Sequence, residues 1–297
     1  MKNNPPPHFS IIIPTLNRDK RLRLAINSVV EQSFTDFELI IVDDGSANDV
    51  QAVINEFNDA RIKIVRNQKS LGAAAARNKG IEAACGEWVV FLDDDDVFYS
   101  NRLESAVQGE MENPDAIFGF CAVEKAYEKL NKKKVFLPAV DEASTFALRL
   151  STSVLTVRRE ELQAIGGFDT SFQVSEDRDL VLGLVVNGGD FYVSDKPLVK
   201  RVFHNETQLS KRIGFYRQAC SDENLLSKYS AFILQKPELY SFVSVLIANS
   251  YSRCSEYSKA ANYYSTAADN ASSEVVKYRL KALQCRIKSF FFSKFVR

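Results

Sequence analysis

The stretch that decides the fold is Trp88–Asp96, with the sequence WVVFLDDDD. The apolar run Trp88–Leu92 is typical of a buried strand, and four consecutive aspartates follow it. Adjacent carboxylates repel one another unless a cation lies among them. Mg²⁺ and Mn²⁺ prefer oxygen ligands, and nucleotide phosphates often complete their coordination. The stretch therefore indicates either a metal–nucleotide site at the carboxyl edge of a sheet or a solvated acidic loop.

The residues before this stretch alternate short apolar runs with helical periods. Ile11–Ile13, Phe37–Val42 and Ile62–Val65 are predicted strands, and the segments between them repeat apolar residues at helical spacing. This alternation predicts an α/β fold of the Rossmann-like kind, with a mostly parallel sheet covered by helices on both faces. From Phe215 onward only helical periodicity remains, so we expect a catalytic domain over residues 1–214 and a helical region over 215–297.

Composition excludes several functional classes. The chain has 297 residues, 45% of them hydrophobic, and its 38 Lys and Arg balance its 38 Asp and Glu. A net charge of zero provides no overall field for nucleic acid. The five cysteines form no CxxC pair, which favours free thiols in a reducing compartment and not a structural zinc. With no signal-peptide core or membrane-spanning run, we expect either a cytoplasmic protein or one attached peripherally to the inner face of the membrane.

Three further motifs lie at predicted strand ends or on the next helix. Pro14–Arg18 and Val42–Ser46 each follow a strand, and Ala76–Gly80 lies on an alanine-rich helix. Each one alone is also compatible with an ordinary capped turn or a surface arginine. Gly166–Asp169 and Ser175–Asp179 follow later in the chain.

In this order, the motifs resemble those of the family 2 glycosyltransferases. These enzymes have the GT-A fold and transfer sugars from nucleotide diphosphates, and the resemblance covers about the first two-thirds of the chain. It implies a Mn²⁺ or Mg²⁺ cofactor, metal ligands at Asp95 and His204, and a catalytic base at Asp177. His204 is equally compatible with a solvent-facing loop. The resemblance further implies a set of nucleotide-sugar-binding residues: Pro14, Thr15, Asn17, Arg18, Asp43, Asp44, Arg77, Asp93 and Asp94.

The acidic run itself leaves the metal register open. Asp93 and Asp95 match the family's DxD pair, but Asp94 is acidic where a small neutral residue is common. Asp94 and Asp96 therefore form an alternative pair.

The chemistry of an inverting transfer agrees with these roles. A carboxylate must accept the proton of the acceptor hydroxyl on the face opposite the leaving diphosphate, and a metal must neutralise that diphosphate. The resemblance further implies transfer from a nucleotide-diphosphate sugar, a UDP-sugar in the first place, to a glycan or glycolipid in bacterial surface polysaccharide synthesis. The competing hypothesis is a catalytically degenerate scaffold whose helical tail binds a partner.

The C-terminal region carries two weaker signals. Leu239–Ser273 has small residues and tyrosines at a spacing that resembles one tetratricopeptide repeat, although a generic helical hairpin fits equally. Arg286–Arg297 is basic and rich in phenylalanine, with no acid. It is suited either to peripheral contact with an anionic membrane surface or to packing on the helical region.

Overall fold

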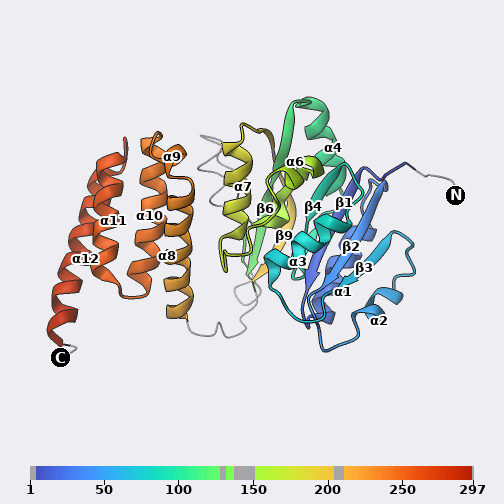
Figure 1. The fold of residues 1–297 in the computed structure, drawn as a ribbon, viewed down its shortest axis with the longest axis horizontal. Helices are drawn as coiled ribbons and strands as arrows, with labels where there is room; N and C mark the ends of the chain where they lie inside the picture. Colours follow the sequence, from blue (N-terminus) through green and yellow to red (C-terminus); the bar gives the residue numbers. More distant parts are fainter. Residues whose placement is uncertain (1–4, 128–131, 137–150, 204–210, 296–297) are drawn as a thin grey trace. The chain divides into compact units, whose positions relative to one another are not determined.

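A computed structural model describes residues 5–127, 132–136, 151–203 and 211–295 (Figure 1). The chain divides into two compact units. The first contains residues 1–170 and 176–205, and the second contains residues 171–175 and 206–297.

The first unit is built on a nine-stranded sheet. The strands lie in the order β3, β2, β1, β4, β8, β6, β9, β5, and β7 pairs with the outer part of β6. Their bounds are β1 Phe9–Thr15, β2 Phe37–Asp43, β3 Ile62–Arg66, β4 Trp88–Phe91, β5 Asp96–Phe98, β6 Ala116–Tyr127, β7 Lys132–Phe136, β8 Leu155–Arg158 and β9 Asp190–Phe203.

The direction of the strands determines where the motifs meet. Strands β3, β2, β1 and β4 are parallel, and Thr15 lies opposite Asp43 in the register of β1 and β2. The carboxyl ends of these strands therefore share one edge. Beyond β4, the pairs β4–β8, β8–β6, β6–β7 and β9–β5 are antiparallel, and β6–β9 is parallel. The predicted α/β class is confirmed, with a sheet that is mixed in its second half.

Helices cover this sheet. Their bounds are α1 Asp19–Val30, α2 Val50–Asn55, α3 Ala73–Ala83, α4 Arg102–Glu112, α6 Arg159–Ala164 and α7 Glu176–Val186, with a short 3-10 turn, η2, at Thr152–Val154. Helices α1, α2 and α3 follow the carboxyl ends of β1, β2 and β3, at the edge where the motifs lie. Helix α3 packs on β1 and β2 (Figure 1). A Cβ atom on Gly80 would come within 2.4 Å of the Ile12 side chain, so a glycine is needed for this close approach.

The second unit consists of consecutive helices. Their bounds are α8 Lys211–Lys228, α9 Ser230–Ile233, α10 Pro237–Arg253, α11 Tyr257–Asn270 and α12 Val275–Phe295. Helix α10 packs between α8 and α11, and α11 packs on α12 (Figure 1). Ala260 and Ala267 are fully buried, which lets the paired helices approach. The expected helical C-terminal segment is confirmed.

One strand of the first unit was not foreseen. Strand β9 was not predicted, because its residues Asp190–Phe203 mix charged and apolar side chains. The expected domain boundary near Gly214 stays a prediction; Gly214 lies in the first turn of α8. None of the described helices is both long enough and apolar enough to cross a membrane.

Candidate active site

A cavity of about 410 Å³ lies at the shared carboxyl edge of β1, β2 and β4. Its size is that of a small-ligand site. It is lined by four aspartates, three arginines and several small or apolar residues: Pro14, Thr15, Leu16, Arg18, Asp44, Ser70, Gly72, Ala73, Ala76, Arg77, Asp93, Asp94, Asp95 and Arg201. The motifs Pro14–Arg18, Val42–Ser46, Ala76–Gly80 and Trp88–Asp96 thus all contribute residues to the cavity wall.

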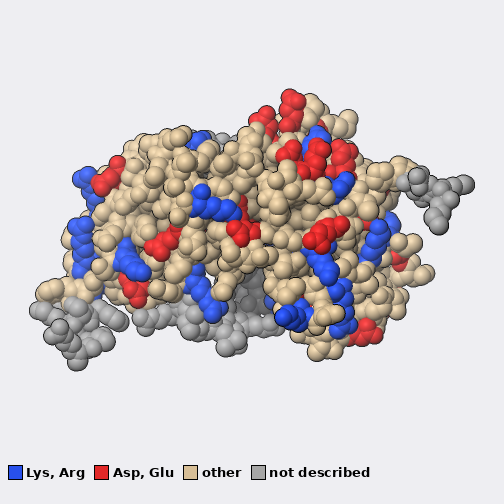
Figure 2. All heavy atoms as spheres, viewed as in Figure 1, with Lys and Arg blue, Asp and Glu red and all other residues tan. Residues whose placement is uncertain are grey.

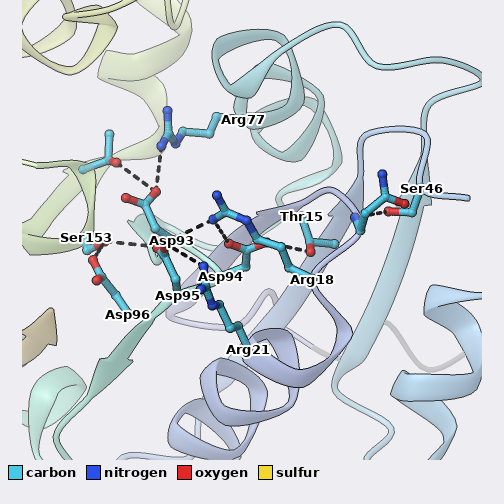
Figure 3. Close-up of polar contacts among 12 residues, drawn as sticks. Thr15, Arg18, Arg21, Ser46, Arg77, Asp93, Asp94, Asp95, Asp96 and Ser153 are labelled. Carbon is cyan, nitrogen blue, oxygen red and sulfur yellow. Dashed lines mark hydrogen bonds and ion pairs between the residues drawn. The ribbon is translucent and has the colours of Figure 1, made fainter. Parts of the chain in front are cut away.

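Asp93 is held by Arg77 (Figure 3). The Nη2 atom of Arg77 donates to Asp93 Oδ1 at 2.7 Å, and Thr152 Oγ1 donates to the same oxygen at 3.4 Å. Burial alone would raise the pKa of Asp93, but the charge of Arg77 outweighs it and holds that pKa below its usual range. Asp93 therefore stays ionised at the cavity wall.

Asp94 and Asp95 meet the first motif. Asp94 accepts hydrogen bonds from Thr15 Oγ1 and from Arg18 Nη1, both at 2.8 Å. Arg18 Nη1 also lies 3.1 Å from Asp95 Oδ2, and Arg21 lies 3.8 Å from the same oxygen. The side chain of Asp94 is only 6% exposed, whereas that of Asp95 is 32% exposed. Asp94 is thus used to join β1 to the acidic run, and Asp95 faces the cavity more openly.

Asp96 is turned away from the cavity and into the protein. Its Oδ2 accepts from Ser153 Oγ at 2.8 Å, and the backbone N–H of Asp93 donates to the same Ser153 oxygen at 3.2 Å. Its Oδ1 is buried without a hydrogen-bond partner among the described residues. Burial, together with the charge of Asp93, raises the pKa of Asp96 to about 7. This environment makes Asp96 a structural link between the acidic run and η2.

Asp44 fixes the opposite wall. Its carboxylate accepts hydrogen bonds from the Leu71 and Gly72 N–H groups, from Asn67 Nδ2 at 2.8 Å and from Ser70 Oγ at 2.7 Å. These bonds outweigh burial and lower the pKa of Asp44. The segment from residue 67 to residue 72 is thereby drawn onto the end of β2.

Gly45 is required for this approach. It has a φ of +86°, and a Cβ atom there would lie 2.8 Å from the Lys69 carbonyl carbon. Only glycine combines that backbone conformation with that contact.

Arg77 connects the cavity to α7. Its Nη1 donates to Glu176 Oε1 at 2.9 Å, and its side chain is 6% exposed. The next residue, Asp177, is half-buried. Burial, with a smaller contribution from the negative charge of Glu176, raises the pKa of Asp177 to about 6. A carboxylate with this pKa can accept a proton near neutral pH and release it again.

Three of the predicted site residues do not line the cavity in the described structure: Asn17, Asp43 and Asp177. Asn17 accepts from the Ala47 N–H at 2.8 Å, and Asp43, fully buried, accepts from the Ser46 N–H at 2.8 Å. Both residues shape the turn behind the cavity wall. His204 lies outside the described residues.

Sequence reasoning missed three contributors. Arg21 is one helical turn beyond Arg18, and this spacing could have indicated that both reach the same carboxylate. Thr152 and Ser153 carry no local signal, because η2 is brought to the acidic run by the pairing of β8 with β4.

The oxygen-rich wall fits a hard divalent cation. Among the described residues, no group of three or more His, Cys, Asp and Glu side chains is placed to hold a metal on its own. Such a cage is not required, since Mg²⁺ in nucleotide sites commonly uses one or two carboxylates plus substrate phosphates. Asp93 and Asp95 are carboxylates of this kind, and both line the cavity.

The fold and this cavity define a class of protein, the nucleotide-sugar transferases with a GT-A fold. Residues 10–158 match the family model described as Glycosyl transferase family 2. The chain belongs to this family and is a glycosyltransferase.

Relatives and one solved structure agree with this assignment. The putative colanic acid biosynthesis glycosyl transferase WcaA of Escherichia coli K12 is 30% identical over 71% of this chain and 77% of its own length. The UDP-Glc:alpha-D-GlcNAc-diphosphoundecaprenol beta-1,3-glucosyltransferase WfgD of Escherichia coli is 36% identical, over 35% of this chain and 41% of its own length. The mannosyltransferase PcManGT of Pyrobaculum calidifontis, solved with GDP-Man and Mn²⁺, has a similar fold. That similarity has a TM-score of 0.61 at 16% identity, and covers 96% of this chain and 86% of PcManGT.

Proposed function

We propose that this glycosyltransferase is metal-dependent and inverting, and that it moves a sugar from a UDP-sugar to a hydroxyl of a glycan or glycolipid in bacterial surface polysaccharide synthesis. The observation that carries the proposal is the arrangement around Arg77. One guanidinium holds Asp93 at the cavity and Glu176 at the start of α7, so the acidic run and the proposed base Asp177 are tied to one group.

The nucleotide-sugar would occupy the cavity. Backbone and side chains of Pro14, Thr15 and Arg18 form the wall near the acidic run, and Asp44 fixes the wall from Ser70 to Gly72. We assign Asn17 and Asp43 to nucleotide binding through the turn that they hold behind this wall.

The diphosphate brings negative charge to a wall that already carries Asp93, Asp94 and Asp95. Mn²⁺ or Mg²⁺ bound at Asp95, with Asp93 beside it, would supply the neutralising charge for the leaving diphosphate. PcManGT contains Mn²⁺, and its shared fold supports this choice. His204 as a further ligand, and Asp94 with Asp96 as an alternative pair, remain predictions. Asp96 makes the poorer ligand, because it is buried and bonded to Ser153.

Asp177 is the proposed base. It would accept the proton of the acceptor hydroxyl as that oxygen attacks the anomeric carbon. Its raised pKa suits this role, and the Arg77–Glu176 contact positions the start of the helix that carries it. The names of WcaA and WfgD support a role in surface polysaccharide or lipid-linked glycan synthesis.

Two measurements test the proposal. Calorimetric titration of UDP, GDP and dTDP, each with Mn²⁺ and with EDTA, shows which nucleobase the site prefers and whether nucleotide binding needs a metal. We expect the tightest binding for UDP with Mn²⁺. For the stereochemistry, NMR of the product should show an anomeric configuration opposite to that of the donor. Retention of configuration would exclude the single displacement.

A further inference from the structure

Helix α12 presents an apolar stripe on its exposed side. The stripe consists of Val276, Leu280, Leu283, Ile287 and Phe290, whose exposed fractions range from 48% to 72%. They are spaced at i, i+4, i+7, i+11 and i+14, so they form one continuous row over three turns and more. Soluble proteins rarely expose a row of large apolar side chains without a use for it.

The stripe is distinct from the side of α12 that packs within the helical unit. Ala282 and Cys285 are buried and lie on the opposite side of the helix, at the contact between α12 and α11. Helix α12 is therefore apolar on two sides: one lies at the contact with α11, and the other, the stripe, is about half exposed or more along its length.

Basic side chains lie on both sides of the stripe. Lys277 and Lys288 are exposed on one side, and Arg279 and Arg286 are exposed on the other. Lys and Arg side chains gather along the edge of the helical unit that α12 forms (Figure 2). From Val275 to Arg297 the sequence contains seven Lys or Arg and no Asp or Glu, although the whole chain has a net charge of zero.

We propose that this stripe and its basic flanks dock on the surface of an anionic phospholipid membrane. A row of apolar side chains between cationic ones is the pattern of a helix that lies in the membrane interface. Lys and Arg carry long apolar stems, so their charged ends reach the headgroups while the stripe enters the acyl boundary. The docking face begins at Val276, ten residues before the basic tail that the sequence alone indicated.

A second copy of this chain fits the stripe less well. In a paired helix the positions beside the stripe would meet their counterparts, and here they carry positive charge, with no acid from Val275 to Arg297 and with the preceding acid, Glu274, already paired with Lys277. An anionic surface is complementary to both flanks at once. The proposal does not depend on the transferase reaction, so a failure here leaves the proposed function untouched.

The test is co-sedimentation of the full-length protein with vesicles of phosphatidylcholine alone and of phosphatidylcholine with 30% phosphatidylglycerol. We expect binding to the anionic vesicles that weakens as salt is added. Leu283→Gln with Ile287→Gln should weaken it at least about tenfold, because both side chains lose their transfer into the acyl boundary. Arg279→Glu should weaken it by about 25-fold, since it removes one attractive charge and adds one repulsive charge of similar weight.

A matched control is available in the same unit. Leu234 is 55% exposed, as is Leu280, but it lies at the end of α9 and outside the stripe. Leu234→Gln should bind vesicles like the unchanged protein, and melting curves should show that all variants are folded. No binding by the full-length protein, or equal binding by the stripe variants, overturns the proposal. So does a dimer in solution that Leu283→Gln dissociates without any change in vesicle binding, because the stripe would then be a protein interface.

Discussion

Replacing Arg77 by methionine tests the arrangement on which the site depends. The Arg77 side chain is 6% exposed and ion-paired with Asp93 at 2.7 Å and Glu176 at 2.9 Å. Methionine retains most of the volume but leaves two carboxylates without their shared cation. Breaking a buried ion pair by removing one partner typically costs about 3–5 kcal/mol. For a unit of this size, that loss lowers the melting temperature by about 6–20 °C.

The chain offers its own reporter and its own control. Trp88 is the only tryptophan, and it is buried in β4, so its fluorescence follows the unfolding of the first unit alone. Arg23 pairs with Glu56 at 2.7 Å, but both side chains are exposed. Because exposed pairs add little to stability, Arg23→Met should leave the melting curve unchanged.

A second substitution sharpens the result. Adding Glu176→Gln to Arg77→Met removes one of the two uncompensated charges, so part of the lost stability should return. Arg77→Met alone should also bind UDP more weakly, because Asp93 loses the ion pair that holds its carboxylate at the cavity wall. If Arg77→Met melts at the same temperature as Arg23→Met, the guanidinium is not a buried bridge and our explanation of the site is wrong.

Four further outcomes follow from the contacts of the site. Asp177→Asn should lower kcat by about 10²–10⁴-fold with nearly unchanged UDP affinity, because the lost carboxylate acts only on the acceptor proton; a variant with normal kcat contradicts the assignment. The activity should rise with pH through about 6, where Asp177 loses its proton, and a profile that is flat down to pH 4.5 would indicate another base. The pKa of Asp177 is higher in the folded protein than in the unfolded chain, so the charged carboxylate destabilises the folded state at pH 7.5. Asp177→Asn removes that charge and should therefore raise the melting temperature at this pH. Ser153→Ala removes the hydroxyl that bonds both Asp96 and the Asp93 N–H, and should lower the free energy of unfolding by about 1–3 kcal/mol. We also expect it to weaken UDP binding. Normal stability would show that water replaces the hydroxyl.

The sequence predicted the parallel strands whose ends form the site better than the antiparallel pairing that completes the sheet. Apolar runs such as Ile11–Ile13 and Trp88–Leu92 identify parallel strands because burial on both faces leaves no room for polar side chains. Strand β9 was not predicted because charged and apolar residues are mixed over its fourteen positions without a regular period. Antiparallel pairing through β8 and β9 is what brings η2 and Arg201 to the acidic run, and no local pattern encodes it.

The roles of the aspartates show the same limit. Four identical residues, Asp93–Asp96, have four different environments that depend on partners from 16 to 79 residues away. The sequence indicated that the run carries charge chemistry. It did not show that Asp96 turns inward to Ser153, or that Asp44 uses both oxygens to hold the opposite wall.

The most direct test of the central claim is the affinity of UDP for the intact protein and for Asp95→Ala, each measured by calorimetry in Mn²⁺ and in EDTA. Asp115→Ala, which removes an exposed carboxylate outside the cavity, serves as the control. We predict that Mn²⁺ strengthens UDP binding to the unchanged protein and to the control, and that this gain is lost in Asp95→Ala. An affinity that neither EDTA nor Asp95→Ala alters would contradict a metal–diphosphate site at this wall.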